Sequence, residues 1–532
     1  MIEKYYSGVI EQIYNRIGKE TRNIVMANYS NDFSIENLEV IRRYQSNEDN
    51  VFFAYSEFSY NTLVGAYEPF LDIICNMHRH FIGGSFDDFQ KECGVYYLHR
   101  QVLNSYYETG ECFREETVLL NEVAYEQRRM TKAIVDMLKR LSEVRPLMIV
   151  INRFQMASKS SIETIKYLID NPCTNIGIVL GVNVQVKGTD STVEVWDRIV
   201  ESLEDRSAIY YIGSAGQQKN HIRDTSDDEL YITTNFEQSI QEASNIMEFL
   251  DYEQARRGCR IIEHKIKFED AWIDEKSLRR FYLIYARTSV LLGEMSKAIE
   301  LTNEYKALIP ESDSEHYFSI YYFMKGTCYM YQGKLEKAEG CAKKAYDYAL
   351  LADDELLEFK SELLSVMIKM SGWYNIFFCV QDIPVSDEFI EKIIKHGYRN
   401  HLAHIYIYAY DNSRDVVKQS FYDESLLKHF TKGLELAKKI ENEQLVYDAY
   451  QKTIMLASTN GLNEIAFLYV IRTYEFMKEH GNIYVARVLT AIGYNLSAMG
   501  KNELVDDYYN TAINMLYYLK MPEDIAEVYY NK

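Results

Sequence analysis

Residues 146–155 read Pro-Leu-Met-Ile-Val-Ile-Asn-Arg-Phe-Gln, and this stretch decides the fold. Five consecutive apolar residues follow the proline, and the polar residues Asn152 and Arg153 end the run abruptly. A short apolar run with such limits predicts a central strand that is buried on both faces of a sheet. Residues 160–169 then carry apolar side chains at helical spacing, so we expect a helix behind that strand.

Further alternation of strand and helix occupies about the first 215 residues. Four more short apolar runs predict strands at 23–27, 50–55, 175–181 and 207–212. Helical patterns fill the intervals, including an expected helical stretch over residues 84–145 and a helix over 194–203. Strands that alternate with helices predict an α/β domain, in which a parallel sheet is covered by helices on both faces.

The loop after the first strand, residues 28–34, stands where a P-loop fold would bind phosphate. Such a loop needs glycines, so that backbone N–H groups can converge on the anion, and a lysine to neutralise it. The motif GxxxxGK[ST] is absent, and the loop contains neither glycine nor lysine. Asp32 would repel phosphate, and Asp32 or Ser34 is available to cap the following helix. Asn31, Asp32 and Ser34 are therefore at most vestigial nucleotide positions.

Residues 152–161, Asn-Arg-Phe-Gln-Met-Ala-Ser-Lys-Ser-Ser, allow a comparison with a known family. Over about residues 1–215, the order of elements resembles the STAND class of AAA+-like P-loop ATPases, in particular bacterial regulators of the maltose-activator and LuxR-like type. In that family two acidic residues end the corresponding strand and hold magnesium. Here the Gln, Ala and Ser positions remain, while Asn152 and Arg153 replace both acids. The resemblance thus implies a degenerate ATPase module.

Two parts of such regulators are not recognisable here. Residues 213–235 are too few for the winged-helix segment that usually follows the ATPase, and they read as a polar linker. No DNA-binding helix-turn-helix is visible. We therefore predict a degenerate P-loop domain over residues 1–215, a linker over 216–235, and a helical repeat domain over 236–532.

The helical part has an internal period of the tetratricopeptide type. Gly293 and Gly333 are 40 residues apart, as are Ala298 and Ala338. Small residues recur where paired helices approach closely, and glycine stands at the turns between them. Proposed signature positions are Ala286, Gly293, Ala298, Gly326, Tyr329, Gly333, Ala338, Ala345, Gly493, Gly500 and Ala512. Stacked helix pairs form a superhelix that can bind a protein or peptide. Pro522 opens a last helix that resembles half a repeat, so the repeat domain is possibly incomplete at its C-terminus and self-association is a further hypothesis.

The composition of the chain argues against several other classes of partner. The formal charge of −21 disfavours direct contact with nucleic acid or with an anionic membrane. No apolar stretch is long enough to span a membrane, and no signal peptide is recognisable. Eight cysteines without a CxxC pair fit reduced thiols and a cytoplasmic location. Cys75, His78 and His80 do not share one helical face, so we predict no metal site, and we expect no cofactor.

Three functional hypotheses follow. The first is a non-catalytic signalling scaffold, with a pseudo-ATPase module and repeats that bind a protein or peptide. The second is a nucleotide-binding STAND switch with an unusual site. The third is a sensory module whose output domain, DNA-binding or nucleotide cyclase, lies outside this chain. The sequence offers no catalytic residues of another class, since it has neither GxSxG nor HExxH.

Overall fold

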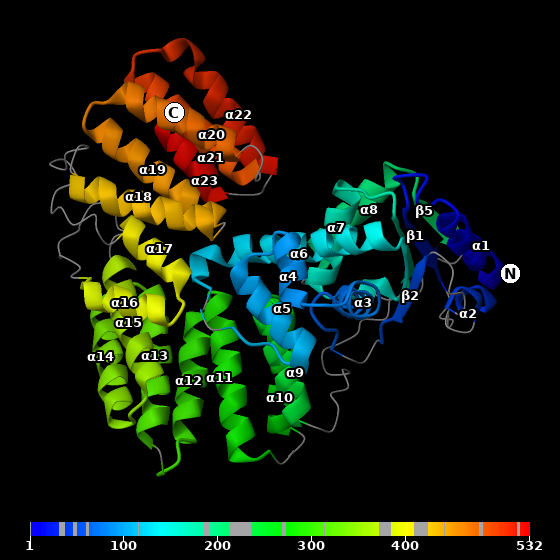
Figure 1. The fold of residues 1–532 in the computed structure, drawn as a ribbon, viewed down its shortest axis with the longest axis horizontal. Coiled ribbons are helices and arrows are strands. Elements are labelled where there is room, and N and C mark those ends of the chain that lie inside the picture. The colour runs from blue at the N-terminus through cyan, green and yellow to red at the C-terminus, as the bar shows by residue number, and fades with distance from the viewer. Residues whose placement is uncertain are drawn as a thin grey trace. The chain divides into compact units, whose positions relative to one another are not determined.

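The computed structural model describes most of the chain. The described residues are 2–30, 38–45, 51–59, 63–114, 116, 118–185, 192–212, 236–268, 273–312, 314–371, 385–408, 424–440, 442–477, 482–518 and 522–532. They form two compact units, Met1–Cys328 and Tyr329–Lys532, each of which is described by itself (Figure 1). The loop positions Asn31, Asp32 and Ser34 and the expected linker 216–235 lie outside the described residues. The proposed domain boundary at that linker therefore stays a prediction.

The first unit is built on a five-stranded sheet in which every strand pair is parallel, as predicted. The strands are β1 (Ile24–Tyr29), β2 (Phe52–Glu57), β3 (Leu147–Asn152), β4 (Ile176–Asn183) and β5 (Ile209–Ile212). Their order is β2-β3-β4-β1-β5, so the run after Pro146 forms an interior strand, while the middle position belongs to β4. Both β3 and β4 are buried along their whole length, as their continuous apolar runs require.

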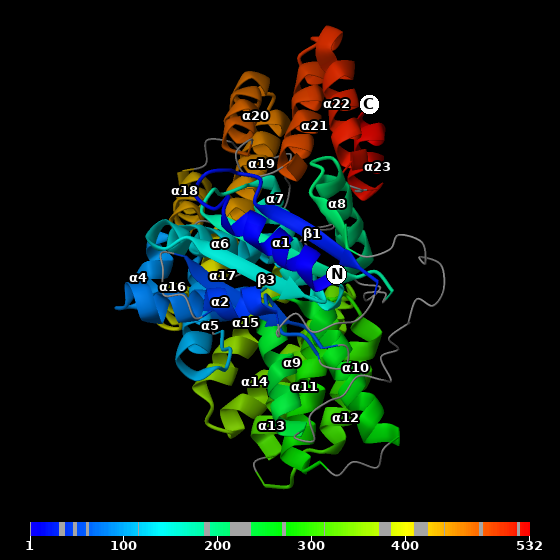
Figure 2. The same ribbon diagram turned by 90° about the vertical axis from the view of Figure 1, so that its right-hand side faces the viewer.

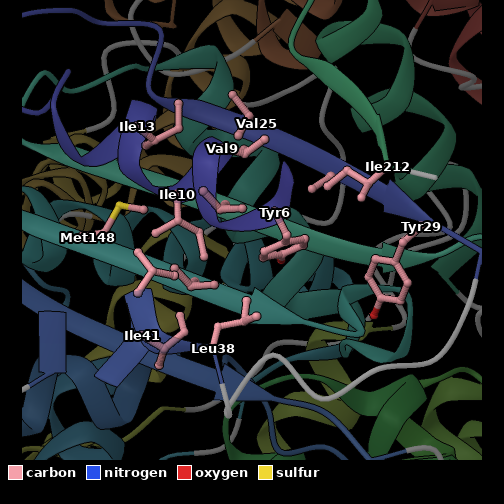
Figure 3. Packing of buried hydrophobic residues seen from close by; sticks show 14 residues of the cluster. Tyr6, Val9, Ile10, Ile13, Val25, Tyr29, Leu38, Ile41, Met148 and Ile212 are labelled. Atoms are coloured by element: carbon pink, nitrogen blue, oxygen red, sulfur yellow. The ribbon is translucent and has the colours of Figure 1, made fainter. Parts of the chain in front are cut away.

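Helices cover the two faces of this sheet (Figure 1). On one face, α1 (Ile2–Tyr14) contacts β1, β4 and β5, and α2 (Glu39–Gln45) contacts β2 (Figure 2). Their side chains meet those of the strands in one apolar cluster, in which Ile10 and Ile13 of α1 are fully buried (Figure 3). On the opposite face lie α6 (Val123–Val144), α7 (Lys159–Asp170) and α8 (Val193–Glu204), which pack in sequence against one another.

Residues 84–145 form several helices, but the prediction that they are helical throughout was wrong. The region contains α4 (Phe86–Glu92), α5 (Tyr97–Thr109) and α6, separated by irregular segments. Gly94 and Gly110 have φ values of 69° and 75° at the ends of α4 and α5. Glycine adopts this left-handed conformation at little cost, and it stops a helix there. Before them, α3 (Phe70–Met77) begins after Pro69 and continues into one π-helical turn, His78–Ile82.

Five helices complete the first unit. They are α9 (Phe236–Glu248), α10 (Tyr252–Phe268), α11 (Glu275–Leu291), α12 (Met295–Ala307) and α13 (Ser314–Tyr331), the last of which spans the division between the units. Consecutive helices pack as pairs, α9 with α10 and α11 with α12. No helix among the described residues is long and apolar enough to cross a membrane.

The second unit contains helices only, among the residues described. They are α14 (Leu335–Leu351), α15 (Glu355–Ser371), α16 (Asp387–Lys395), α17 (Arg399–Tyr408), α18 (Glu424–Lys439), α19 (Glu443–Thr459), α20 (Asn463–Met477), α21 (Asn482–Ala498), α22 (Val505–Tyr518) and α23 (Pro522–Asn531). Neighbours in sequence pack side by side, which is the arrangement of a helical repeat array.

The turns of both helical regions share one geometry. Gly293, Gly333 and Gly500 all have positive φ. In each case the residue after the glycine donates its N–H to a carbonyl five residues earlier, as Lys334 does to Tyr329 at 2.9 Å. This bond closes the end of a helix in the Schellman pattern. Of the other signature positions, Ala286, Ala298, Ala338, Ala345 and Ala512 are buried between helices, Gly326 and Tyr329 lie within α13, and Gly493 lies in α21.

Candidate functional site

The carboxyl edge of the sheet is where an α/β fold of this kind would hold a ligand. Here β2 and β3 end side by side, with Glu57 opposite Asn152 in the register. The strand β1 ends at Tyr29, and β4 ends at Asn183. The two vestigial nucleotide positions that the structure describes, Asn152 and Arg153, therefore lie together at this edge.

Asn152 is fully buried and is already engaged within the protein. The hydroxyl of Tyr29 donates a hydrogen bond of 2.5 Å to Asn152 Oδ1. Among the described residues, Asn152 Nδ2 has no hydrogen-bond partner. Magnesium binds through oxygen ligands, usually including carboxylates, so a neutral amide whose oxygen already accepts a bond is a poor ligand. The side chain therefore fixes the ends of β1 and β3 to each other.

Arg153 is turned towards the neighbouring strand. Its backbone has a φ of 54°, and its guanidinium lies 3.1 Å from the carboxylate of Glu57. The same Nη1 donates to the carbonyl of Phe58 at 3.4 Å. Glu57, a residue that the sequence did not single out, is a carboxylate beside the vestigial magnesium position, and Arg153 neutralises it. A side-chain cation thus pairs with the acid that could otherwise have bound a metal ion.

The residues after Arg153 connect β4 with the start of α7. The backbone N–H of Asn183 donates to Gln155 Oε1 at 3.2 Å, while Gln155 Nε2 has no partner among the described residues. Ser158 caps α7 by accepting a bond from the N–H of Ser161 at 3.4 Å. The retained Gln and Ser positions therefore hold the backbone of the edge together.

Metal binding elsewhere is not supported. No cluster of three His, Cys, Asp or Glu side chains suited to a metal occurs in the described part of the chain. Burial raises the pKa of the Cys75 thiol to about 11, which disfavours the thiolate that a metal needs. His78 Nδ1 lies 3.1 Å from the hydroxyl of Tyr107, and His80 Nδ1 lies 2.8 Å from the carbonyl of Asn76.

The start of α7 is bonded to the helices of the repeat region. Asp251, which is buried in the turn between α9 and α10, accepts a bond of 3.0 Å from the N–H of Ser160. Its other oxygen accepts from the N–H of Gln254 at 3.3 Å. Burial raises the pKa of Asp251, and these donors oppose the rise. An ion pair of 3.0 Å between Lys159 and Glu253 lies beside it. The helix that follows the vestigial edge is thus capped by a residue distant in sequence.

A second set of buried charges joins the same regions. Arg114 donates to the carbonyl of Glu248 at 2.7 Å, and Arg287 pairs with the Glu248 carboxylate at 3.0 Å. Nearby in sequence, the fully buried His99 has its Nε2 2.8 Å from a carboxylate oxygen of Glu126. Burial lowers the pKa of His99 to about 4 and outweighs the attraction of Glu126. None of these contacts was predictable from the sequence, because each partner belongs to a different helix or loop.

The helical regions contain two cavities of contrasting chemistry. In the first unit, a cleft of about 710 Å³ is lined by α10, α11 and the start of α12. Lys297 in this cleft is paired, since it lies 3.2 Å from Glu263 of the lining and 3.0 Å from Glu300. In the second unit, a cavity of about 280 Å³ between the α16–α17 turn and the end of α18 is lined mainly by apolar side chains.

Comparisons with known proteins find solved structures of similar fold, but with low sequence identity and low TM-scores. No family model matches the sequence, and no curated protein matches it. A solved STAND (Signal Transduction ATPase with Numerous Domains) protein with a tetratricopeptide repeat sensor, from Pyrococcus horikoshii, is similar over 98% of this chain and 90% of its own, with 11% identity and a TM-score of 0.45.

Two further solved structures match a little over half of the chain. A Rap protein complexed with competence and sporulation factor covers 55% of this chain and 79% of its own, with 14% identity and a TM-score of 0.38. NprR in complex with its cognate peptide NprX covers 56% and 81%, with 13% identity and a TM-score of 0.37. Similarity at this level assigns neither a family nor a function to this chain.

Proposed function

We propose that this chain is a non-catalytic signalling or regulatory scaffold, in which the α/β region is a structural platform and the helical repeats bind a protein or peptide. The observation that carries the proposal is that the polar side chains at the carboxyl edge of the sheet already bind one another. Asn152 Oδ1 accepts from Tyr29, and Arg153 neutralises Glu57. The side chains at the vestigial magnesium position, Asn152 and Arg153, are therefore engaged with other protein groups.

Phosphoryl transfer depends on positioning the phosphates and on cations that neutralise them. A phosphate-binding loop with neither glycine nor lysine supplies neither feature, and Asp32 adds a repulsive charge. What remains is a buried sheet that holds α7, which in turn is bonded to Asp251 in the repeat region. This linkage supports a role as a platform on which the repeats are mounted.

The alternative is a nucleotide-binding switch whose output domain lies outside this chain. One observation favours it: Asn152 Nδ2, Gln155 Nε2 and Asn28 Oδ1 are buried atoms that lack partners among the described residues. Such donors and acceptors could serve a polar ligand, since buried polar atoms normally have partners. The two functions differ in one measurable property, the affinity for MgATP.

Thermal unfolding of the full chain with and without MgATP distinguishes them. A ligand at 100 times its dissociation constant stabilises a protein by about 2.7 kcal/mol. We expect no shift with MgATP, with magnesium alone or with ATP alone. A magnesium-dependent shift with ATP that is lost in Arg153→Gln would overturn the scaffold and establish the nucleotide switch.

A further inference from the structure

The polar cleft of the first unit, about 710 Å³ in volume, brings together three consecutive helices of the repeat region. Arg260 and Glu263 come from α10, Tyr285 comes from α11, and residues 293–297 form the turn that leads into α12. All of these residues lie within the described segments 236–268 and 273–312. The volume is in the range of pockets that hold small ligands.

Arg260 is the cation of this lining that has no carboxylate partner among the residues described. Glu294 of the lining forms an ion pair with Arg256. Glu263 pairs with Lys297 at 3.2 Å. The side chain of Arg260 is exposed, and it makes neither an ion pair nor a hydrogen bond with any described residue. Its positive charge is therefore left uncompensated at the cleft.

The hydroxyl of Tyr285 is a second group that indicates a ligand. Only 2% of the surface of Tyr285 is exposed, yet its hydroxyl has no hydrogen-bond partner in the described part of the chain. Burial raises the pKa of Tyr285 to about 12, and Glu263 adds to the rise, while Lys297 and Arg260 oppose it. The hydroxyl therefore stays protonated at neutral pH and lies among the charges of the cleft. Buried hydroxyls normally have partners, so this one fits a hydrogen-bond acceptor in a ligand.

The start of α12 adds backbone donors to the same cleft. Glu294 precedes this helix without capping it through its side chain, and the first turn contains no acidic residue. Within the described segments, the N–H groups of Ser296 and Lys297 have no acceptor. The first N–H groups of a helix carry a partial positive charge, so they favour an anion at this position.

A singly charged carboxylate complements these groups. A guanidinium binds a carboxylate through two parallel hydrogen bonds, and the remaining lone pairs of the carboxylate can accept from a hydroxyl or a backbone N–H. A phosphate dianion fits less well, because Glu263 and Glu294 belong to the same lining and repel a second negative charge. A cationic ligand is disfavoured, since both of these carboxylates already hold cations.

We propose that this cleft binds a carboxylate-bearing ligand, with the carboxylate on Arg260, the Tyr285 hydroxyl and the first turn of α12. A free carboxylic acid and the C-terminal carboxylate of a peptide share this chemistry. The inference goes beyond the proposed function and is independent of it, because it requires neither a closed sheet edge nor any contact of the second unit.

The test uses the full chain and matched pairs of probes. One pair is a panel of small monocarboxylic acids and the corresponding primary amides, observed by saturation-transfer NMR. The other pair is a pool of N-acetylated tripeptides with either a free or an amidated C-terminus, selected by ultrafiltration and identified by mass spectrometry. We expect carboxylates to bind at least about 10-fold more tightly than the matched amides. Tighter binding of the acids or of the peptides identifies which source of carboxylate the cleft selects.

Three variants assign the binding to the cleft. Arg260→Gln removes the charge, and we expect binding at least about 10-fold weaker. Tyr285→Phe keeps the buried ring and loses the hydroxyl, and we expect binding about 5-fold weaker. The control Lys276→Gln removes an exposed cation at the start of α11, outside the lining, and should bind as the wild type does. Thermal melting establishes that each variant is folded.

Three outcomes would overturn the site. They are the absence of binding by every carboxylate probe, equal binding by the wild type and Arg260→Gln, and equally tight binding of inorganic phosphate. None of them bears on the scaffold, because the MgATP measurement does not involve this cleft.

Discussion

The two compact units are stabilised in different ways. The first unit buries charged side chains, among them Arg114, Glu116, Glu126, Glu248 and Asp251. In the second unit, no Asp, Glu, Lys or Arg is buried among the residues that the structure describes. Its interior is instead formed mainly by aliphatic and aromatic residues and alanines, together with buried polar residues that carry no formal charge, such as Asn400 and Asn442.

This difference affects how strictly the positions of the helices and strands are fixed within each unit. A buried charge is tolerated only beside its own partners, so each pair in the first unit permits one relative placement of the elements that carry it. Apolar packing is less directional, and it accepts neighbours that are somewhat longer, shorter or shifted. A platform requires the first property. An array of stacked helices is compatible with the second.

The largest expected effect is that of removing a buried cation from the first unit. Arg114→Met leaves the carbonyl of Glu248 without its 2.7 Å donor and the buried carboxylates nearby without a positive charge. Loss of one partner from a buried charged pair destabilises by about 4 kcal/mol. Urea unfolding, followed by hydrogen exchange of peptides from α5 and α6, would measure it. The exposed cation in Lys439→Met is the control, and we expect a change below about 0.5 kcal/mol. Equal effects of the two substitutions would contradict the difference between the units.

The second prediction concerns pH, again in the first unit. Burial lowers the pKa of His99 to about 4 in the folded state, below the usual value of about 6.5 in the unfolded chain. The neutral imidazole therefore contributes stability that is present above about pH 6.5 and is lost as the pH falls towards 4, a loss of about 3 kcal/mol. Acid titration of unfolding in the wild type and in His99→Gln would show it as a flatter profile for the variant. Parallel profiles would mean that folding does not lower the pKa of His99.

In the second unit, we expect crowding between helices to lower the stability more than the loss of an exposed charge does. A Cβ on Gly493 of α21 would lie 2.7 Å from the buried ring of Tyr509, so Gly493→Ala forces the two helices apart. Overpacking of this kind destabilises by about 2 kcal/mol. In Gly340→Ala the new Cβ meets open space on α14, and a better helix former should stabilise by about 1 kcal/mol. Thermal unfolding of both variants measures the contrast, and a stabilised Gly493→Ala would rule out tight packing there.

The sequence predicted the sheet well, because buried strands of a parallel sheet are short apolar runs with abrupt ends. The run before Asn152 and the run over 175–181 both became strands within a residue or two. Residues 84–145 are not helical throughout, and greater weight on Gly94 and Gly110 would have corrected that prediction.

The contacts of the candidate site were not predictable in the same way. Local patterns identify Asn152 and Arg153 as replacements, but they do not reveal that Tyr29 and Glu57 are their partners. Those pairings depend on the strand order β2-β3-β4-β1-β5, which brings together residues more than a hundred positions apart in the case of Tyr29 and Asn152.

The smallest expected effect is that of a substitution in the turn between α14 and α15 of the second unit. It tests whether polar interactions contribute to the stability of that unit. Asp353, between α14 and α15, has a φ of 53°, and the N–H of Asp354 donates to the carbonyl of Ala349 at 3.1 Å. This is the same turn that Gly333 makes, with a residue that pays a steric penalty in the left-handed region. Asp353→Gly relieves the strain but frees the unfolded chain, so we expect a net gain of about 0.5 kcal/mol and a small rise in Tm. The reverse change, Gly333→Asp, should cost about 1 kcal/mol. If Asp353→Gly instead lowers the Tm, the carboxylate itself stabilises the turn, and polar interactions matter in the second unit as well as in the first.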